Sequence, residues 1–273
     1  MRRGAASVAL HAALLAGGVL VLTPMAWMLA ASFMAPGEAN NYPPRFVPHA
    51  ATLEQYRALF IRLDLGRYLL NSAIVSTAAT AISVVVNSMA GYALTKLRFR
   101  ARERVFRSLS LGLLVPTQVA MLPLFLLFKQ LGLVNTYWGV IVPSMASIFG
   151  IFLIRQYLLT LPDDLLDAAR IDGASEFRIY RSIVLPLITP ILATLAIWTF
   201  LNTWNDFQWP LVILTDSERY TLPVALANLA GEHVQDTELM MAGAVVTVLP
   251  VMLVFVLLQR YYIRGMTAGG VKG

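Results

Sequence analysis

The 273-residue chain contains no cysteine and little charge. Without cysteine, disulfide bonds, thiol catalysis and most structural zinc sites are excluded. Only 13% of the residues are charged, about half the share of an ordinary soluble domain, whereas 58% are hydrophobic. The three histidines lie far apart, and none has a carboxylate at metal-ligand helical spacing. We therefore expect a membrane protein that binds no metal or cofactor of its own.

A nucleotide-binding loop is missing as well. The chain has no G-x-x-x-x-G-K-[ST] pattern, and Lys272, the one glycine-flanked lysine, lacks the upstream glycine spacing. The chain therefore cannot hydrolyse ATP alone by that route.

Long intervals without Asp, Glu, Lys or Arg are the main feature present. Six such intervals hold at least 21 residues each, enough at about 1.5 Å rise per residue to cross about 30 Å of hydrocarbon. They do not alternate as the strands of a membrane barrel do. We predict an all-α integral membrane protein, one transmembrane domain over residues 1–273. Its six expected spans lie at about 8–33, 69–94, 108–128, 137–157, 186–213 and 239–262.

Basic residues are unevenly distributed around these spans. If both termini are cytoplasmic, the inside segments hold 15 of the 21 basic residues, including a cluster at 96–107. Cytoplasmic loops of membrane proteins carry this excess, so we predict a multi-pass protein of the bacterial inner membrane with both termini inside. The net charge of +6 is then a topology signal rather than a nucleic-acid signal. Contact of the cluster with anionic lipid heads stays open.

One polar inside loop, at about 160–186, separates two apolar segments. Pro162, Asp163 and Asp164 suit the first turn of a helix and its positive dipole end. Leucines and alanines then give an apolar face as far as Ile171, and Gly173 lets the helix end. We expect a short helix on the membrane surface, which either docks a partner protein or packs against its own bundle.

The spacing of this loop resembles the EAA loop of bacterial ABC importer permeases, E-A-A-x3-G-x9-I-x-L-P. The chain departs from it only by Asp for Glu at position 167. The Trp204-Asn205-Asp206-Phe207 segment and the glycine-rich end are similar to the smaller permease of maltose-type carbohydrate importers. Residues that the resemblance assigns to ATPase coupling are Asp167, Ala168, Ala169, Asp172, Gly173, Phe177, Ile183, Leu185 and Pro186.

The resemblance implies a pore-forming subunit of an ATP-driven sugar importer, not an enzyme. It implies a heterodimer with a second, related permease, two ATPase subunits that bind ATP and Mg, and an extracellular or periplasmic sugar-binding protein. The C-terminal tail is either a frayed terminus or a second ATPase contact, in which case glycines would allow an extended backbone. Its contact residues would be Gly269, Gly270, Lys272 and Gly273.

Polar residues inside the fifth expected span are candidates for the solute path. Asn202, Asn205 and Asp206 share one helix face, with Trp204 nearby, and a continuous helix from Leu187 would rise about 28 Å to Asp206. This face either lines an outer gate or sugar cavity, or seals helix packing. Weaker candidates are Asn87 and Gln118, and we expect kinks at Pro116, Pro123 and Pro143.

Two other functions stay open. A permease for another solute, such as glycerol phosphate, would need a basic cavity, and the six charge-free intervals supply no Lys or Arg. An ion-coupled secondary carrier would need several buried ionisable groups or inverted repeats, whereas Asp206 is the only candidate acid.

Overall fold

The computed structural model describes residues 2–232 and 236–270, which form helices and connecting loops with no strand among them. Two compact units are formed by these residues. One contains the chain up to Arg67 together with Ala225–Pro250, and the other contains Tyr68–Val224 and the residues from Val251 on. The all-α prediction is confirmed. The single-domain prediction is not tested by this division, because residues of α13 (Leu222–Glu232) and α14 (Thr237–Gly270) belong to both units.

The first unit contains α1 (Arg2–Ala31), α2 (Glu54–Arg57) and η1 (Ala58–Arg62). An irregular strap joins α1 to α2. The Glu38 carboxylate holds this strap by accepting the backbone N–H of His49 at 2.8 Å, which lowers the pKa of Glu38. The strap is also fixed to α14, because buried Glu238 accepts the Ala39 N–H at 2.6 Å.

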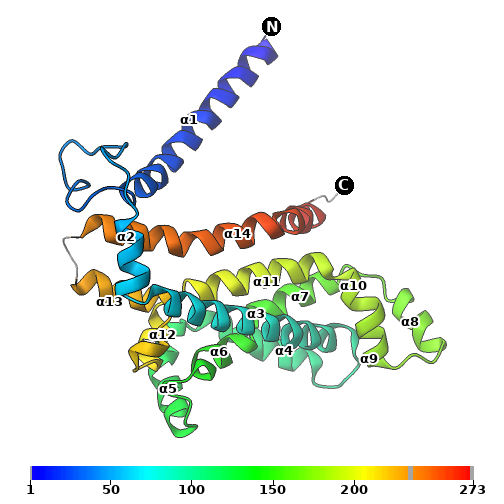
Figure 1. The fold of residues 1–273 in the computed structure, drawn as a ribbon. Helices are drawn as coiled ribbons and strands as arrows, with labels where there is room; N and C mark the ends of the chain where they lie inside the picture. The colour runs from blue at the N-terminus through cyan, green and yellow to red at the C-terminus, as the bar shows by residue number, and fades with distance from the viewer. Residues whose placement is uncertain (1, 233–235, 271–273) are drawn as a thin grey trace. The chain divides into compact units, whose positions relative to one another are not determined.

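The second unit contains most of the remaining helices. Its longest helix is α3 (Leu65–Lys96), and Figure 1 shows α3, α7 and α11 running side by side with α8 beyond their ends. The other elements are α4 (Arg102–Leu111), η2 (Gly112–Leu114), α5 (Thr117–Gln130), α6 (Tyr137–Met145), α7 (Ile148–Leu158), α8 (Asp164–Ile171), α9 (Glu176–Ile179), η3 (Tyr180–Val184), α10 (Leu185–Leu187), α11 (Thr189–Trp204), α12 (Gln208–Ile213) and η4 (Ser217–Arg219).

Four stretches of the described chain are long and apolar enough to cross a membrane, and the number rises to six if two bent helix pairs each count as one span. The straight candidates match the expected first, second, fourth and sixth spans. The third bends by 107° between η2 and α5, and the fifth by 80° between α10 and α11. The six-span count therefore stays a prediction.

Prolines account for both bends. Val115 is extended, with ψ 118°, as expected for a residue before proline, and Pro116 starts α5. Pro190 cannot donate to the Pro186 carbonyl, which instead accepts the Thr189 hydroxyl at 2.9 Å. The rise of about 28 Å from Leu187 to Asp206 assumed a continuous helix, and this condition is not met: α11 has 16 residues, or about 24 Å. Pro143 lies near the end of α6, whereas α5 continues through Pro123.

Close packing holds α3, α7 and α11 together. A Cβ at Gly150 of α7 would lie 3.0 Å from both Asn87 Cγ of α3 and Leu195 Cδ1 of α11, so only glycine fits without movement. Asn87 is fully buried and accepts the Ser147 N–H at 2.9 Å, at the break between α6 and α7. These contacts make the three helices a firm support for the loop that follows α7.

Candidate functional site

The loop at 160–186, hereafter the loop segment, folds around one glycine turn. α8 ends where Gly173 takes a φ of +81°, a left-handed conformation that side chains disfavour. The Gly173 N–H bonds the Arg170 carbonyl and the Ala174 N–H bonds the Ala169 carbonyl, both at 3.0 Å. Ser175 then caps α9 by accepting the Arg178 N–H at 3.4 Å. The predicted role of Gly173 in ending the helix is confirmed, because α8 stops at Ile171, two residues before it.

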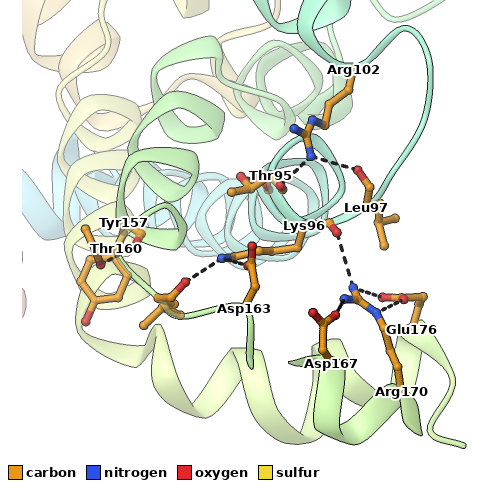
Figure 2. Close-up of polar contacts among 12 residues, drawn as sticks. Thr95, Lys96, Leu97, Arg102, Tyr157, Thr160, Asp163, Asp167, Arg170 and Glu176 are labelled. Atoms are coloured by element: carbon orange, nitrogen blue, oxygen red, sulfur yellow. Dashed lines mark hydrogen bonds and ion pairs between the residues drawn. The ribbon is translucent and has the colours of Figure 1, made fainter. Parts of the chain in front are cut away.

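Arg170 joins both arms of this turn to α3 (Figure 2). Its guanidinium contacts Asp167 at 2.6 Å and Glu176 at 2.8 Å, and also donates to the Lys96 carbonyl at 3.4 Å. Tyr92 of α3 donates to the other oxygen of Glu176 at 2.6 Å. Hydrogen bonds from Arg170 and Tyr92 lower the pKa of Glu176, and Glu176 in turn raises the pKa of Arg170. The turn is thus fixed to α3 by charge-assisted hydrogen bonds.

Lys96, the last residue of α3, makes a second attachment (Figure 2). Its side chain is only 5% exposed, and its ammonium contacts Asp163 at 2.5 Å and the Leu161 carbonyl at 2.7 Å. The hydrogen bond from Lys96 lowers the pKa of Asp163. α8 starts at Asp164, as the sequence predicts, and Asp163 stands at its N-cap position; the Asp163 side chain makes no cap hydrogen bond and pairs with Lys96 instead.

Apolar side chains of the loop segment complete the attachment. Leu166, Ile179 and Val184 are buried in a cluster that also contains Ile154 and Leu158 of α7. Ala169, Ile183 and Leu185, predicted as coupling residues, pack against the same cluster. The Tyr180 hydroxyl lies 2.7 Å from the Ser88 hydroxyl of α3. The expectation that this loop packs against its own bundle therefore holds for one face.

The opposite face is exposed. Ile171 is 86% exposed and Phe177 62%, and Ala168, Asp172 and Gly173 lie beside them at the surface. Pro186 is also exposed, whereas Asp167 is partly covered and paired with Arg170. The exposed face is apolar and includes the small side chain of Ala168, and the other face of the turn is bonded to α3. Such a surface is suited to contact with another protein.

A separate cavity of about 840 Å³ lies at the other end of α11. Three predicted solute-path residues, Asn202, Asn205 and Asp206, line it together with Trp198 and Trp209. No Lys or Arg is among the residues that line it. Both asparagines donate within α11, to Trp198 and Leu201 carbonyls at 2.8 Å. Asp206 accepts the Trp209 N–H at 3.4 Å, at the start of α12.

The remaining predicted residues lie elsewhere. Trp204 is 1% exposed and stacks on Phe200 with ring centres 5.6 Å apart, so it packs instead of lining the cavity. The Asn87 side chain is buried between helices and bonds the Ser147 N–H, so it does not line the cavity. Gln118 is exposed, and it is not among the residues that line the cavity. In the tail, Gly269 and Gly270 end helix α14 rather than forming an extended segment, while Lys272 and Gly273 lie outside the described residues.

Comparison with known families places this geometry in context. Residues 83–268, which include the loop segment and the cavity, match the family described as binding-protein-dependent transport system inner membrane component. The chain belongs to this family. It is therefore a transporter subunit of the membrane, and the resemblance seen in the loop spacing is confirmed.

Curated relatives of this permease are similar over nearly their whole length. It is 39% identical to the arabinooligosaccharides transport system permease protein AraQ of Halalkalibacterium halodurans, over 93% of this chain and 92% of that protein. It is 34% identical to the diacetylchitobiose uptake system permease protein NgcG of Streptomyces coelicolor, covering 92% and 84%. It is 32% identical to the sn-glycerol-3-phosphate transport system permease protein UgpE of Brucella abortus, covering 94% of each.

A solved structure supports the fold. A chain of a bacterial ABC transporter involved in the import of the acidic polysaccharide alginate superposes with a TM-score of 0.84 at 24% identity, covering 96% of the permease and 98% of that chain. The permease therefore has the fold of an ABC importer membrane subunit.

Sequence reasoning missed the residues that fix the loop segment from behind. The sequence marks Lys96 and Arg170 only as cytoplasmic charges, and it does not mark Tyr92 or Glu176 at all. Lys96 is one of only three lysines in the chain, which is a weak signal. Tyr92 gives none, because an aromatic residue near the end of an apolar span is ordinary.

Proposed function

We propose that the permease is the pore-forming subunit of an ATP-driven importer of neutral sugars. In this proposal it pairs with a second, related permease, and two ATPase subunits that bind ATP and Mg act on it from the cytoplasm. An extracellular or periplasmic binding protein delivers the sugar. Both termini, and the loop segment, face the cytoplasm.

The observation that carries the coupling part of this proposal is the two-faced loop segment. Its exposed face presents Ile171 and Phe177, and its inner face is fixed by Arg170 and Lys96. An ATPase that holds the exposed face would move the fixed helices with it. Because the turn is rigidly attached, little of that motion would be lost in the loop.

The cavity supports a neutral solute. Amide groups and tryptophans are suited to hydrogen bonding and stacking with a sugar, and the lining supplies one carboxylate and no cation. Two of the similar proteins bear names that refer to oligosaccharides, whereas UgpE is named for glycerol phosphate. Glycerol phosphate is therefore the second candidate solute, and it would require cations from the partner permease.

Reconstitution tests this proposal. The permease would be assembled with its second permease and ATPase in liposomes, and ATP hydrolysis measured with the cognate binding protein. Arabinooligosaccharides, diacetylchitobiose and glycerol 3-phosphate would be compared as solutes. Stimulation by a neutral sugar alone is the expected result. Stimulation by glycerol 3-phosphate alone would overturn the sugar assignment, and uptake without any ATPase subunit would overturn the ATP-driven mechanism.

A further inference from the structure

The structure divides the basic cluster at 96–107 into two sets. Lys96 and Arg102 turn inward: Lys96 holds the loop segment, and Arg102 donates to the Thr95 and Leu97 carbonyls at 2.9 and 3.3 Å. Arg98, Arg100 and Arg104 are exposed and make no hydrogen bond or ion pair with a described residue. The inward pair accounts for the shape of the connection between α3 and α4. Arg98 has an electrostatic influence on Asp163, but Arg100 and Arg104 have no hydrogen-bonded or ion-paired partner among the described residues.

Arg104 lies on α4, and the opposite face of this helix packs against α7, whereas Arg98 and Arg100 lie in the connection that precedes α4. Phe106 stacks against Phe152 of α7 with ring centres 6.2 Å apart, and the Arg155 guanidinium lies 3.8 Å from the Phe106 ring. Arg155 also pairs with Glu103 at 3.1 Å. Glu103 is the only acidic residue between 97 and 111, and it also pairs with the exposed Arg107 at 3.6 Å, which leaves Arg98, Arg100 and Arg104 without a carboxylate from this segment.

Apolar side chains are exposed between these arginines. Phe99 is 44% exposed and Val105 41%, and the exposed apolar surface continues along the same bent helix pair through Leu111, Leu114 and Val115. α3 and this helix pair are both candidate spans, and the connection between them joins their ends. Arginines interleaved with apolar side chains at the end of a span are suited to the headgroup boundary of a membrane.

We infer that this surface binds the headgroups of anionic phospholipids. Each guanidinium would donate paired hydrogen bonds to a lipid phosphate, and the apolar side chains would enter the acyl boundary. An acidic protein partner would satisfy the arginines but not the apolar surface from Leu111 to Val115. The lipid would hold the end of α3, to which the loop segment is attached. Residues of this basic surface are Arg98, Phe99, Arg100, Arg104, Val105 and Arg107.

Native mass spectrometry of the assembled transporter tests this inference. The complex, incubated with equal phosphatidylglycerol and phosphatidylcholine, should retain phosphatidylglycerol preferentially. Each arginine near an anionic membrane strengthens binding about fivefold. The preference of the R98Q/R100Q/R104Q variant for phosphatidylglycerol over phosphatidylcholine should therefore fall by roughly tenfold or more. The R98K/R100K/R104K variant keeps the charge and should retain most of it.

A matched variant separates a local surface from overall charge. R45Q/R57Q/R62Q removes three other exposed arginines and should keep the preference for phosphatidylglycerol. Equal loss in both glutamine variants would overturn the inference, because net charge alone would then explain binding. Unchanged lipid retention with loss of the ATPase subunits would also overturn it, and would assign the surface to a protein partner.

Discussion

The loop segment and the cavity face of α11 use their polar side chains in opposite ways. In the loop segment, Arg170 and Lys96 connect residues that are far apart in the sequence. On the cavity face, Asn202 and Asn205 bond only the preceding turn of their own helix, among the interactions described. The first region is therefore fixed to its neighbours, whereas the second keeps polar groups next to open space.

This difference predicts that substitutions in the two regions have different effects on transport. Loss of an attachment in the loop segment should reduce the transport obtained per ATP hydrolysed, whatever the solute. Loss of a cavity side chain should change the response to the solute and leave the coupling ratio unchanged. A variant that breaks this division would show that the two regions are not independent.

The largest effect is expected for Arg170→Met. Asp167 and Glu176 would lose their shared cation, and hydrogen bonds to charged groups are worth about 1.5–3 kcal/mol when little screened. With partial solvent screening, we expect solute uptake per ATP to fall about tenfold. Uptake and ATP hydrolysis in proteoliposomes provide the measurement.

Arg181→Met is the matched control for Arg170. Arg181 is exposed in the same segment, and its side chain makes no ion pair with a described residue. The Arg181→Met variant loses one positive charge, as Arg170→Met does, but it loses no ion pair with a described residue. Uptake per ATP should therefore stay near that of the unchanged protein. An equal fall in both variants would mean that charge on the loop, rather than the Arg170 contacts, determines coupling.

Gly173 should give the second-largest effect. A Cβ at this position would meet no atom within 4 Å, so space is not limiting, but the φ of +81° costs a side chain roughly 1–2 kcal/mol. Gly173→Ala should therefore reduce ATPase assembly or uptake several-fold, and a bulkier residue should do the same or more. Co-purification of the ATPase subunits and uptake are measured together.

Asparagine distinguishes strain from side-chain size at this position. Because asparagine tolerates left-handed backbone better than alanine, Gly173→Asn should be milder than Gly173→Ala despite its larger side chain. The reverse order would indicate that the partner needs the bare backbone at Gly173, rather than the turn.

The sequence predicts the loop segment better than the cavity, for a physical reason. The turn depends on local chemistry, a proline and carboxylates before a short helix and a glycine after it, and such chemistry is visible in the chain. The Lys96–Asp163 contact joins residues 67 positions apart, and the Tyr92–Glu176 contact joins residues 84 positions apart, so no local pattern indicates them.

The cavity was predicted only in part. Asn202, Asn205 and Asp206 all line the cavity, but α11 ends at Trp204, so Asn205 and Asp206 lie beyond the helix and the three do not share one helix face as predicted. Trp204 was expected near that face but is buried, because the side chain between two cavity asparagines points toward the packed side of α11. The 80° bend before Thr189 depends on two prolines and a threonine hydroxyl acting together, which the length of the apolar run concealed.

Asp206→Asn should have a smaller, solute-specific effect. The change removes the only acidic or basic side chain among the described residues that line the cavity, and it keeps a similar shape. For a neutral sugar, the concentration giving half-maximal stimulation of ATP hydrolysis should change about two- to fivefold, as expected for one hydrogen-bonding group of about 0.5–1 kcal/mol. The coupling ratio should not change. A loss of coupling without a change in this concentration would place Asp206 in the transmission of motion instead.

The smallest effect is expected from pH. Hydrogen bonds from Arg170 and Tyr92 lower the pKa of Glu176 below its ordinary value of 4.5. A carboxyl whose pKa is lowered by folding stabilises the fold above its unfolded pKa, and this stabilisation is lost only as pH falls through the lower, folded value. The Arg170 attachment should therefore be unchanged between pH 5 and 8, and uptake per ATP should be constant over that range. Any fall in uptake per ATP below pH 4.5 should be smaller in the Glu176→Gln variant, because this variant has no carboxyl to protonate at position 176. A change in uptake per ATP between pH 5 and 8 that is absent from Glu176→Gln would contradict the ion pair.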